Sequence, residues 1–330
     1  MNDLLFSLNI VMPMALMMAL GYIFKRIGLF DDPFLRSAKK FCFYVLLSCS
    51  LFKNLYDSKL DRLPYRFIIF LVISILFEII LSFVFAKLIA ENGKEEGVIA
   101  QGSFRSNFAY IGFPLAAMFF TDEALIQRVN SEISLASIFV IPLFNVFAVI
   151  ALLKGKEEKD GRGMLKRSFN GIIRNPCILS VFAGMTVLLL RILVPSVSFF
   201  VKNDLPWVYQ ALSYLSSMST PLAFLLVGAD MDFSRSVRDI GKLAKVVLLK
   251  DLVFPILFLL AAFLFRAADS VEYAILVSVF ASPTAVSSAI MAHEMNGDSD
   301  LASEIVVYTT LFSIPSLLVI IYLLRITGCV

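Results

Sequence analysis

The sequence predicts an all-α polytopic membrane protein with ten transmembrane helices, arranged as two inverted five-helix repeats in which helices 4 and 9 are broken and cross. Three observations support this: an apolar composition, ten long apolar segments, and prolines that recur in both halves. Hydrophobic residues make up 59% of the 330 residues and charged residues 17%, whereas soluble domains contain roughly 45–50% and about 25%. This composition is typical of a chain whose helices face lipid.

Ten apolar segments are each close to the ~20 residues that a helix needs to cross the hydrocarbon core of a bilayer. The first is too long for the core of a signal peptide and follows no basic region, so we expect it to be retained as a helix. The segments are 4–24, 36–56, 64–90, 96–120, 132–153, 174–194, 206–229, 243–266, 271–293 and 301–324.

Lysine and arginine predict the orientation of the chain, because cytoplasmic loops carry an excess of both. With the N-terminus outside, the cytoplasmic loops hold about twice as many of these residues as the outer loops. We therefore expect both termini on the extracytoplasmic side of the plasma (inner) membrane. Residues 154–172, which include KGKEEKDGRGMLKR at 154–167, would then form a charged cytoplasmic linker.

Landmarks that recur in the same order indicate a duplicated chain. Ser-Glu-Ile opens the fifth segment at 131–133 and the tenth at 303–305. Residues 1–153 and 173–330 would thus be two repeats, and because five is an odd number, the second must be inverted. Inverted repeats are typical of secondary transporters, whose sites lie at the repeat interface near the bilayer midplane. The first, fourth and fifth segments of the two halves carry Pro13, Pro114, Pro142, Pro176, Pro283 and Pro315.

Pro114 and Pro283 differ from the other prolines because polar residues cluster beside them. Unpaired backbone groups cost several kcal/mol in hydrocarbon, so a broken helix must line a cavity or pack against protein. Two helices that cross at their breaks would present half-helix N-termini, which attract anions. We therefore expect a site for a small organic anion, centred on the amide of Asn107, which can donate to a carboxylate oxygen. The expected substrate-binding residues are Arg105, Ser106, Asn107, Gly112, Pro114, Ser282, Pro283, Thr284 and Ser287.

Three further ionisable residues lie inside apolar segments, where such residues are costly and often functional. Glu78 lies midway along the third segment, and Lys250 and Asp251 lie in the eighth, the corresponding segment of the second half. One interpretation makes them coupling or support residues, with Glu78 or Asp251 carrying a proton. The other makes them a structural ion pair, either Lys250 with one carboxylate or Arg105 with Glu78.

No catalytic constellation is visible in the sequence, which has a single histidine and lacks the GxSxG, P-loop and GxGxxG motifs. We therefore expect no enzyme activity and no cofactor. The four cysteines show no CxxC spacing, so they do not indicate a metal site. A net charge of +3 without a basic stripe argues against a nucleic-acid partner.

Three stretches of the sequence resemble the auxin efflux carrier family. They are SNFAYIGFPLA at 106–116, ASPTAVSSAIMA at 281–292 and DSDLASEIVVYTTLFSIPSLLVI at 298–320. The family includes the plant PIN-FORMED carriers and many bacterial members, some described as malate permeases. The resemblance covers nearly the whole chain, and the short central loop is similar to that of the bacterial members.

The resemblance implies a rigid scaffold half and elevator-like movement of the half that carries the substrate. It also implies a carboxylate substrate, such as malate or an auxin-like acid, bound near Asn107, Pro114 and Pro283. The chain departs from the family pattern at Phe108–Ala109, where a small Thr-Gly usually follows the asparagine. This difference alters the shape expected of the pocket.

Two other functions fit part of the same pattern. A sodium-coupled symporter of the bile-acid type would share the crossed-helix architecture, and sodium-dependent transport would identify it. A non-transporting membrane receptor fits the composition, but a receptor gains nothing from two costly helix breaks. The expected partners are a small organic anion, H⁺ or Na⁺ as coupling ion, the lipid bilayer and, as an open alternative, a second copy of the chain in a homodimer.

Overall fold

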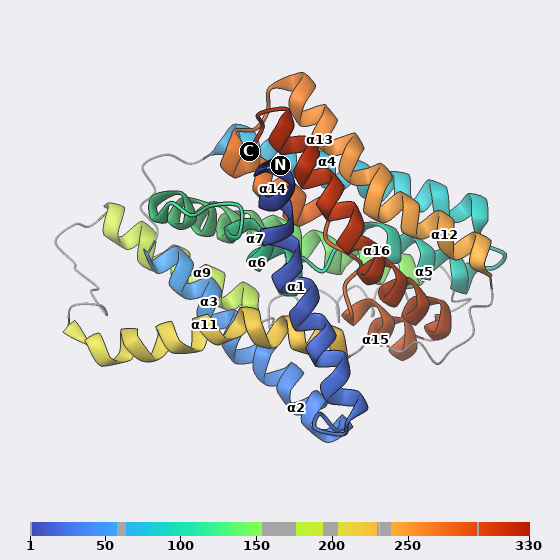
Figure 1. Ribbon diagram of the computed structural model, residues 1–330, viewed down its shortest axis with the longest axis horizontal. Helices are drawn as coiled ribbons and strands as arrows, with labels where there is room; N and C mark the ends of the chain where they lie inside the picture. The colour runs from blue at the N-terminus through green and yellow to red at the C-terminus, as the bar shows by residue number, and fades with distance from the viewer. Residues whose placement is uncertain are drawn as a thin grey trace.

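The computed structural model is helical throughout the elements that it describes (Figure 1). It describes residues 2–57, 64–153, 176–193, 204–229, 231, 239–295 and 297–330. The predicted cytoplasmic linker, 154–172, lies outside these residues. Within the described part, six helices are long and apolar enough to cross a membrane. This agrees with the predicted polytopic membrane protein, whereas the ten-helix inverted arrangement stays a prediction.

The helices of the first half follow the predicted segments closely. The fifth is the exception, because α7 begins at Glu123 instead of 132. The Asp122 carboxylate explains the earlier start, since it accepts from the N–H groups of Ala124 and Leu125 at 2.9 and 3.0 Å. The elements are α1 (Asn2–Arg26), α2 (Asp32–Phe41), the π-helical η1 (Cys42–Leu47), α3 (Ser48–Asp57), α4 (Tyr65–Ile89), α5 (Gly93–Phe104), the π-helical η2 (Phe108–Gly112), α6 (Phe113–Ala117) and α7 (Glu123–Leu153).

In the described part of the second half, the ninth predicted segment is interrupted between α14 and α15. The eighth predicted segment is a continuous helix with a π-helical stretch in its middle. The elements are α9 (Pro176–Leu193), α11 (Pro206–Ala229), α12 (Ile240–Leu248), the π-helical η3 (Leu249–Val253), α13 (Phe254–Phe265), α14 (Ser270–Phe280), α15 (Ser287–Glu294) and α16 (Ser299–Ile326).

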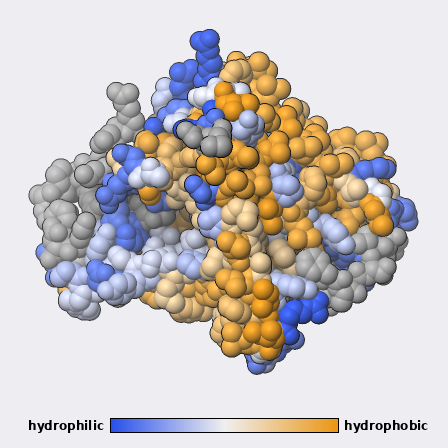
Figure 2. Space-filling model, in the orientation of Figure 1, coloured by the Kyte–Doolittle hydropathy of each residue, from blue (hydrophilic) through white to orange (hydrophobic). Residues whose placement is uncertain are grey.

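The surface of α4 is the reverse of that of a helix in a soluble protein. Its inward side carries the polar residues Ser74, Glu78 and Ser82, all buried. Its outward side is apolar, as expected of a helix that faces lipid while its polar groups face the protein interior. Figure 2 shows apolar residues over much of the face formed by α1 and α16. The exposed apolar residues of α4 are Ile69, Ile73, Phe77, Ile80, Val84 and Leu88.

Most helices fall into two groups by their contacts, and the two groups also pack against each other where α1 meets α16 and α3 meets α7. α11 contacts α1, α2, η1 and α3, which form one group, while α4, α5, α7 and α12–α16 contact one another in the second. The closest approach in the first group is between α1 and α11. A Cβ added to Gly21 would lie 2.0 Å from the Leu225 carbonyl oxygen, and one added to Gly228 would lie 1.8 Å from that of Met18. Such backbone contact requires glycine on both helices and packs the two backbones directly against each other.

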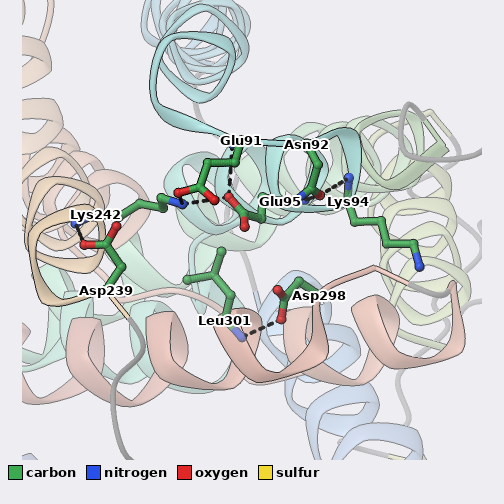
Figure 3. A network of polar contacts seen from close by, with 8 residues as sticks. All are labelled: Glu91, Asn92, Lys94, Glu95, Asp239, Lys242, Asp298 and Leu301. Carbon is green, nitrogen blue, oxygen red and sulfur yellow. Dashed lines mark hydrogen bonds and ion pairs between the residues drawn. The ribbon is translucent and has the colours of Figure 1, made fainter.

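An ion cluster joins the connection between α4 and α5 to the start of α12 (Figure 3). The Lys242 ammonium lies 2.9 Å from Glu91 Oε1 and 2.8 Å from Glu95 Oε2. Asn92 caps α5 by accepting from the N–H groups of Lys94 and Glu95. Burial raises the pKa of Glu95, but hydrogen bonds from Lys242 and from the backbone outweigh burial and hold this pKa below its usual range. The cluster therefore fixes where α5 begins.

Candidate functional site

The two helix interruptions lie against each other. α5 ends at Phe104 and α14 ends at Phe280, and the segments that follow pair through an antiparallel bridge between Ser106 and Thr284. The Asn107 N–H donates to the Pro283 carbonyl at 2.6 Å, and the Ala285 N–H donates to the Arg105 carbonyl at 2.9 Å. Backbone groups that lose their helical partner at one break therefore form hydrogen bonds with the other break. Proline suits its position here because it has no N–H to satisfy.

Side chains strengthen this crossing from both breaks. The Thr284 hydroxyl donates to the Gly102 carbonyl at 2.6 Å, and the Gln101 amide donates to the Ser288 carbonyl at 2.9 Å. The Ser106 hydroxyl donates to the carbonyl of Val279, at the end of α14. The hydrogen bonds therefore run in both directions between α5 and α14, which makes the crossing a single unit.

Three of the predicted site residues have roles in packing at the crossing. A Cβ added to Gly112 would lie 2.7 Å from the Ser278 carbonyl oxygen, so this glycine permits η2 to lie against α14. The Ser282 hydroxyl donates to the Ser278 carbonyl of its own chain segment at 2.6 Å. Pro114 lies in the first turn of α6, where a missing N–H costs little. These residues shape the crossing and do not line the cavity described next.

A cavity of about 320 Å³ lies beside the crossing and is called the basic cavity below. Arg105, Ser106, Asn107 and Ser287 all line it, so the structure brings four of the predicted residues together. Asn107 is 2% exposed, and its side-chain N–H₂ group has no hydrogen-bond partner among the described residues. An unsatisfied buried donor is costly unless a ligand accepts from it. The amide is therefore placed to bind an acceptor atom.

Arg105 presents a buried positive charge to the same cavity. Its guanidinium donates to Asn145 Oδ1 at 2.8 Å and contacts Met291 Sδ at 2.8 Å, and both partners are neutral. Within the described part of the chain it forms no ion pair, so the expected alternative of an Arg105–Glu78 pair is not formed. A guanidinium without a carboxylate partner is suited to bind an anion.

A second cavity, of about 350 Å³, is called the hydroxyl cavity below. It is lined by Pro114 and Ala109, and Ala109 also lines the basic cavity. Both cavities lie between the crossing and the group of helices around α11. The described lining of the hydroxyl cavity contains no charged residue, and its polar members are Ser50, Asn130, Ser216, Ser219 and Thr220.

The three ionisable residues predicted inside the membrane are fully buried. Lys250 Nζ lies 3.3 Å from Glu78 Oε1 and donates to the Ser106 hydroxyl at 2.7 Å. Lys250 therefore pairs with the carboxylate of the other half instead of with its neighbour Asp251. Glu78 Oε2 and both Asp251 oxygens have no hydrogen-bond partner among the described residues. Through Ser106, the Lys250–Glu78 pair is in direct contact with the crossing.

The structure adds residues to the basic cavity that the sequence patterns did not indicate. They are Lys39 and Lys40 in the last turn of α2, Tyr44 in η1, and Asn145 in α7. The signal for Asn145 in the sequence is an amide in the otherwise apolar stretch 138–153, three residues after a proline. The three π-helical stretches of the described chain also lie at the site: η1 and η2 line its cavities, and η3 carries Lys250.

Comparison with known protein families gives a match over nearly the whole chain. A family described as "Membrane transport protein" matches residues 6–321, nearly the whole chain. The chain belongs to this family. It is the auxin efflux carrier family that the sequence resembles, so that prediction is confirmed. None of the curated proteins compared with the chain matches it. Membership of this family makes the chain a membrane transporter, and it agrees with the absence of enzyme motifs.

Proposed function

We propose that the protein is a secondary carrier that moves a small organic anion, a carboxylate such as malate or an auxin-like acid, across the plasma membrane. The observation that supports this most strongly is the pairing of two groups in the basic cavity. The Asn107 side-chain N–H₂ group has no hydrogen-bond partner in the described chain, and the Arg105 guanidinium has no anionic partner there; both residues line this cavity. Together they offer the donors that a carboxylate needs.

An elevator-like movement would use the division of the helices into two groups. The α1–α11 contact, with glycine at Gly21 and Gly228, supplies a stiff scaffold. The crossing belongs to the other group, and both the basic and the hydroxyl cavity lie between it and the helices around α11, with Ala109 in the lining of both. If the crossing slides along α11, the bound anion leaves one cavity and enters the other. The ten-helix inverted repeat and the extracytoplasmic termini are part of this proposal.

A sodium-coupled symporter is the second candidate, and the buried carboxylates favour it. Three oxygens of Glu78 and Asp251 have no hydrogen-bond partner in the described chain, and carboxylates buried without partners are expected to bind a cation or take up a proton. Lys250 connects Glu78 to Ser106, so a change of charge at Glu78 would be felt at the crossing. Coupling to H⁺ and coupling to Na⁺ use the same residues and differ in the gradient that drives transport.

Flux of labelled carboxylates into proteoliposomes tests the proposal. The panel is malate, other dicarboxylates and indole-3-acetate, each measured with and without proton and sodium gradients. We expect saturable flux of one acid that shows counterflow, which a channel would not give. Dependence on one gradient would identify the coupling ion. Absence of flux for every acid in folded protein would remove the carboxylate and favour a receptor.

A further inference from the structure

Two neutral side chains hold the Arg105 guanidinium beside the basic cavity. Its Nη2 donates to Asn145 Oδ1 at 2.8 Å, and its Nη1 lies 2.8 Å from Met291 Sδ. Asn145 lines the basic cavity, whereas Met291 is not part of the described lining. A guanidinium has more N–H groups than these contacts use, so donors remain for a ligand.

The amide of Asn145 is oriented by its own helix. Its Nδ2 donates to the Ile141 carbonyl at 2.9 Å, within α7. Because the other end of the amide is an oxygen, this bond directs Oδ1 toward Arg105. Asn145 therefore presents a neutral acceptor that fixes the guanidinium on one side.

Met291 contacts the guanidinium with a much weaker acceptor. A thioether sulfur is polarizable and packs well, but it carries no charge and accepts hydrogen bonds only weakly. A carboxylate in its place would form a charge-assisted pair with Arg105 and would compete with an anionic ligand. Met291 is half-buried in α15, the helix that follows the second break. It therefore supplies a contact that holds the guanidinium without neutralising it.

We propose that Met291 is a positioning residue of the anion site, which holds the Arg105 guanidinium against Asn145 and, as a weak acceptor, leaves its charge for the ligand. The inference rests on the proposed binding of an anion by Arg105 and adds what sets the affinity. A stronger acceptor in place of the sulfur would compete with the ligand for the guanidinium. The affinity for the anion should therefore fall as the acceptor at this position becomes stronger.

The residues that hold Arg105 would also move with it. Both α7 and α15 contact α5, and all three belong to the second group of helices, as the crossing does. If the crossing slides along α11, Asn145 and Met291 keep their contacts with the guanidinium. The charge is thus equally available to the anion in both cavities, so the carrier can bind the anion on one side and release it on the other.

Substitutions that change the acceptor at Met291 test the inference in the full-length protein. Met291→Leu removes the sulfur and keeps an apolar side chain of similar volume, Met291→Gln introduces a strong neutral acceptor on a side chain of similar length, and Met291→Glu introduces a carboxylate. The probes are malate and indole-3-acetate. The readouts are Kd from binding, KM and kcat from flux, and the midpoint of thermal unfolding.

Met295 provides the matched controls, Met295→Gln and Met295→Glu. It is also half-buried, and its N–H donates to the Met291 carbonyl at 2.9 Å, so it lies one turn further along. In the described chain no hydrogen bond joins its side chain to Arg105, whose partners are Asn145 and Met291. The controls therefore add the same polar groups to the same segment without adding an acceptor for the guanidinium.

We expect the affinity of Met291→Leu to stay within about threefold of wild type, because the volume is conserved. Met291→Gln should weaken binding roughly 3–10-fold and Met291→Glu roughly 10–100-fold, the ranges of one neutral and one charge-assisted hydrogen bond. KM should rise with Kd while kcat stays the same. The Met295 variants should bind as wild type does.

A double-mutant cycle shows whether Met291 acts through Arg105. In the Arg105→Gln background, Met291→Gln should change Kd by less than about twofold, because the charge for which it competes is gone. An equal loss in both backgrounds, or unchanged affinity in Met291→Gln and Met291→Glu, overturns the inference alone. A loss in Met291→Leu as large as that in Met291→Glu overturns it as well, since it shows a packing role. Binding of neither probe to wild type overturns it together with the proposed function.

Discussion

Replacing Lys250 by methionine tests whether the buried ion pair is required to hold the crossing. The change removes the only cation in contact with Glu78 in the described chain, and both side chains are fully buried. Breaking a buried pair by removing one partner costs about 3–5 kcal/mol, since the remaining charge has no compensation. At roughly 2 °C per kcal/mol for a chain of this size, the midpoint of thermal unfolding should fall by about 6–10 °C.

A double variant separates lost charge pairing from lost packing. In Glu78→Met/Lys250→Met both partners become apolar, and such replacements are often close to neutral. We expect the double variant to recover most of the stability that Lys250→Met loses, measured by circular dichroism in one detergent. Lys87→Met, at an exposed lysine of α4, is the control and should match wild type. An unchanged midpoint for Lys250→Met, or a double variant as unstable as the sum of the two single variants, would refute the reasoning.

Three further predictions concern other parts of the molecule. Arg105→Gln removes a charged donor from the basic cavity, worth about 1.5–3 kcal/mol, so KM for the transported anion should rise roughly 10–100-fold; an unchanged KM would place the anion elsewhere. Gly228→Ala puts a Cβ 1.8 Å from the backbone of α1 and should destabilise the protein by about 1–3 kcal/mol. Gly241→Ala is the control, because its nearest contact is at 3.4 Å; equal unfolding midpoints for the two variants would argue against the close helix contact. The pKa of Glu95 is held below its usual range, so the stability from its pair with Lys242 is complete above about pH 4.3 and is lost as the pH falls through the lowered pKa. The difference in unfolding midpoint between wild type and Glu95→Gln should therefore shrink as the pH falls, and a difference that grows at low pH would contradict the sign of the shift.

The helix positions and the two interruptions could be predicted from the sequence because their causes are local. Apolar runs long enough to cross a bilayer predict helices, and Pro114 and Pro283 lie beside polar clusters that mark a break. The predicted contact of the two breaks depends on their matched positions in the two halves, and the Ser106–Thr284 bridge confirms that they meet.

The remainder of the site could not be predicted, because it depends on contacts between elements far apart in the chain. Lys40 and Asn145 join the same cavity from α2 and α7, and their local sequence does not show that they meet there. For the same reason, the sequence does not decide which carboxylate pairs with Lys250. Its neighbour Asp251 was the closest carboxylate in sequence, but in the helix consecutive side chains point in different directions, and Lys250 reaches Glu78 instead.

The account depends most directly on the anion being bound at the crossing. The decisive measurement compares binding and saturable flux of the transported acid for wild type, Asn107→Ala and Asn9→Ala, where Asn9 is an exposed asparagine of α1. The account predicts that Asn107→Ala weakens binding by roughly tenfold or more and lowers flux to match, while Asn9→Ala behaves as wild type. Equal affinity and flux in wild type and folded Asn107→Ala would show that the anion is bound elsewhere and would contradict the account.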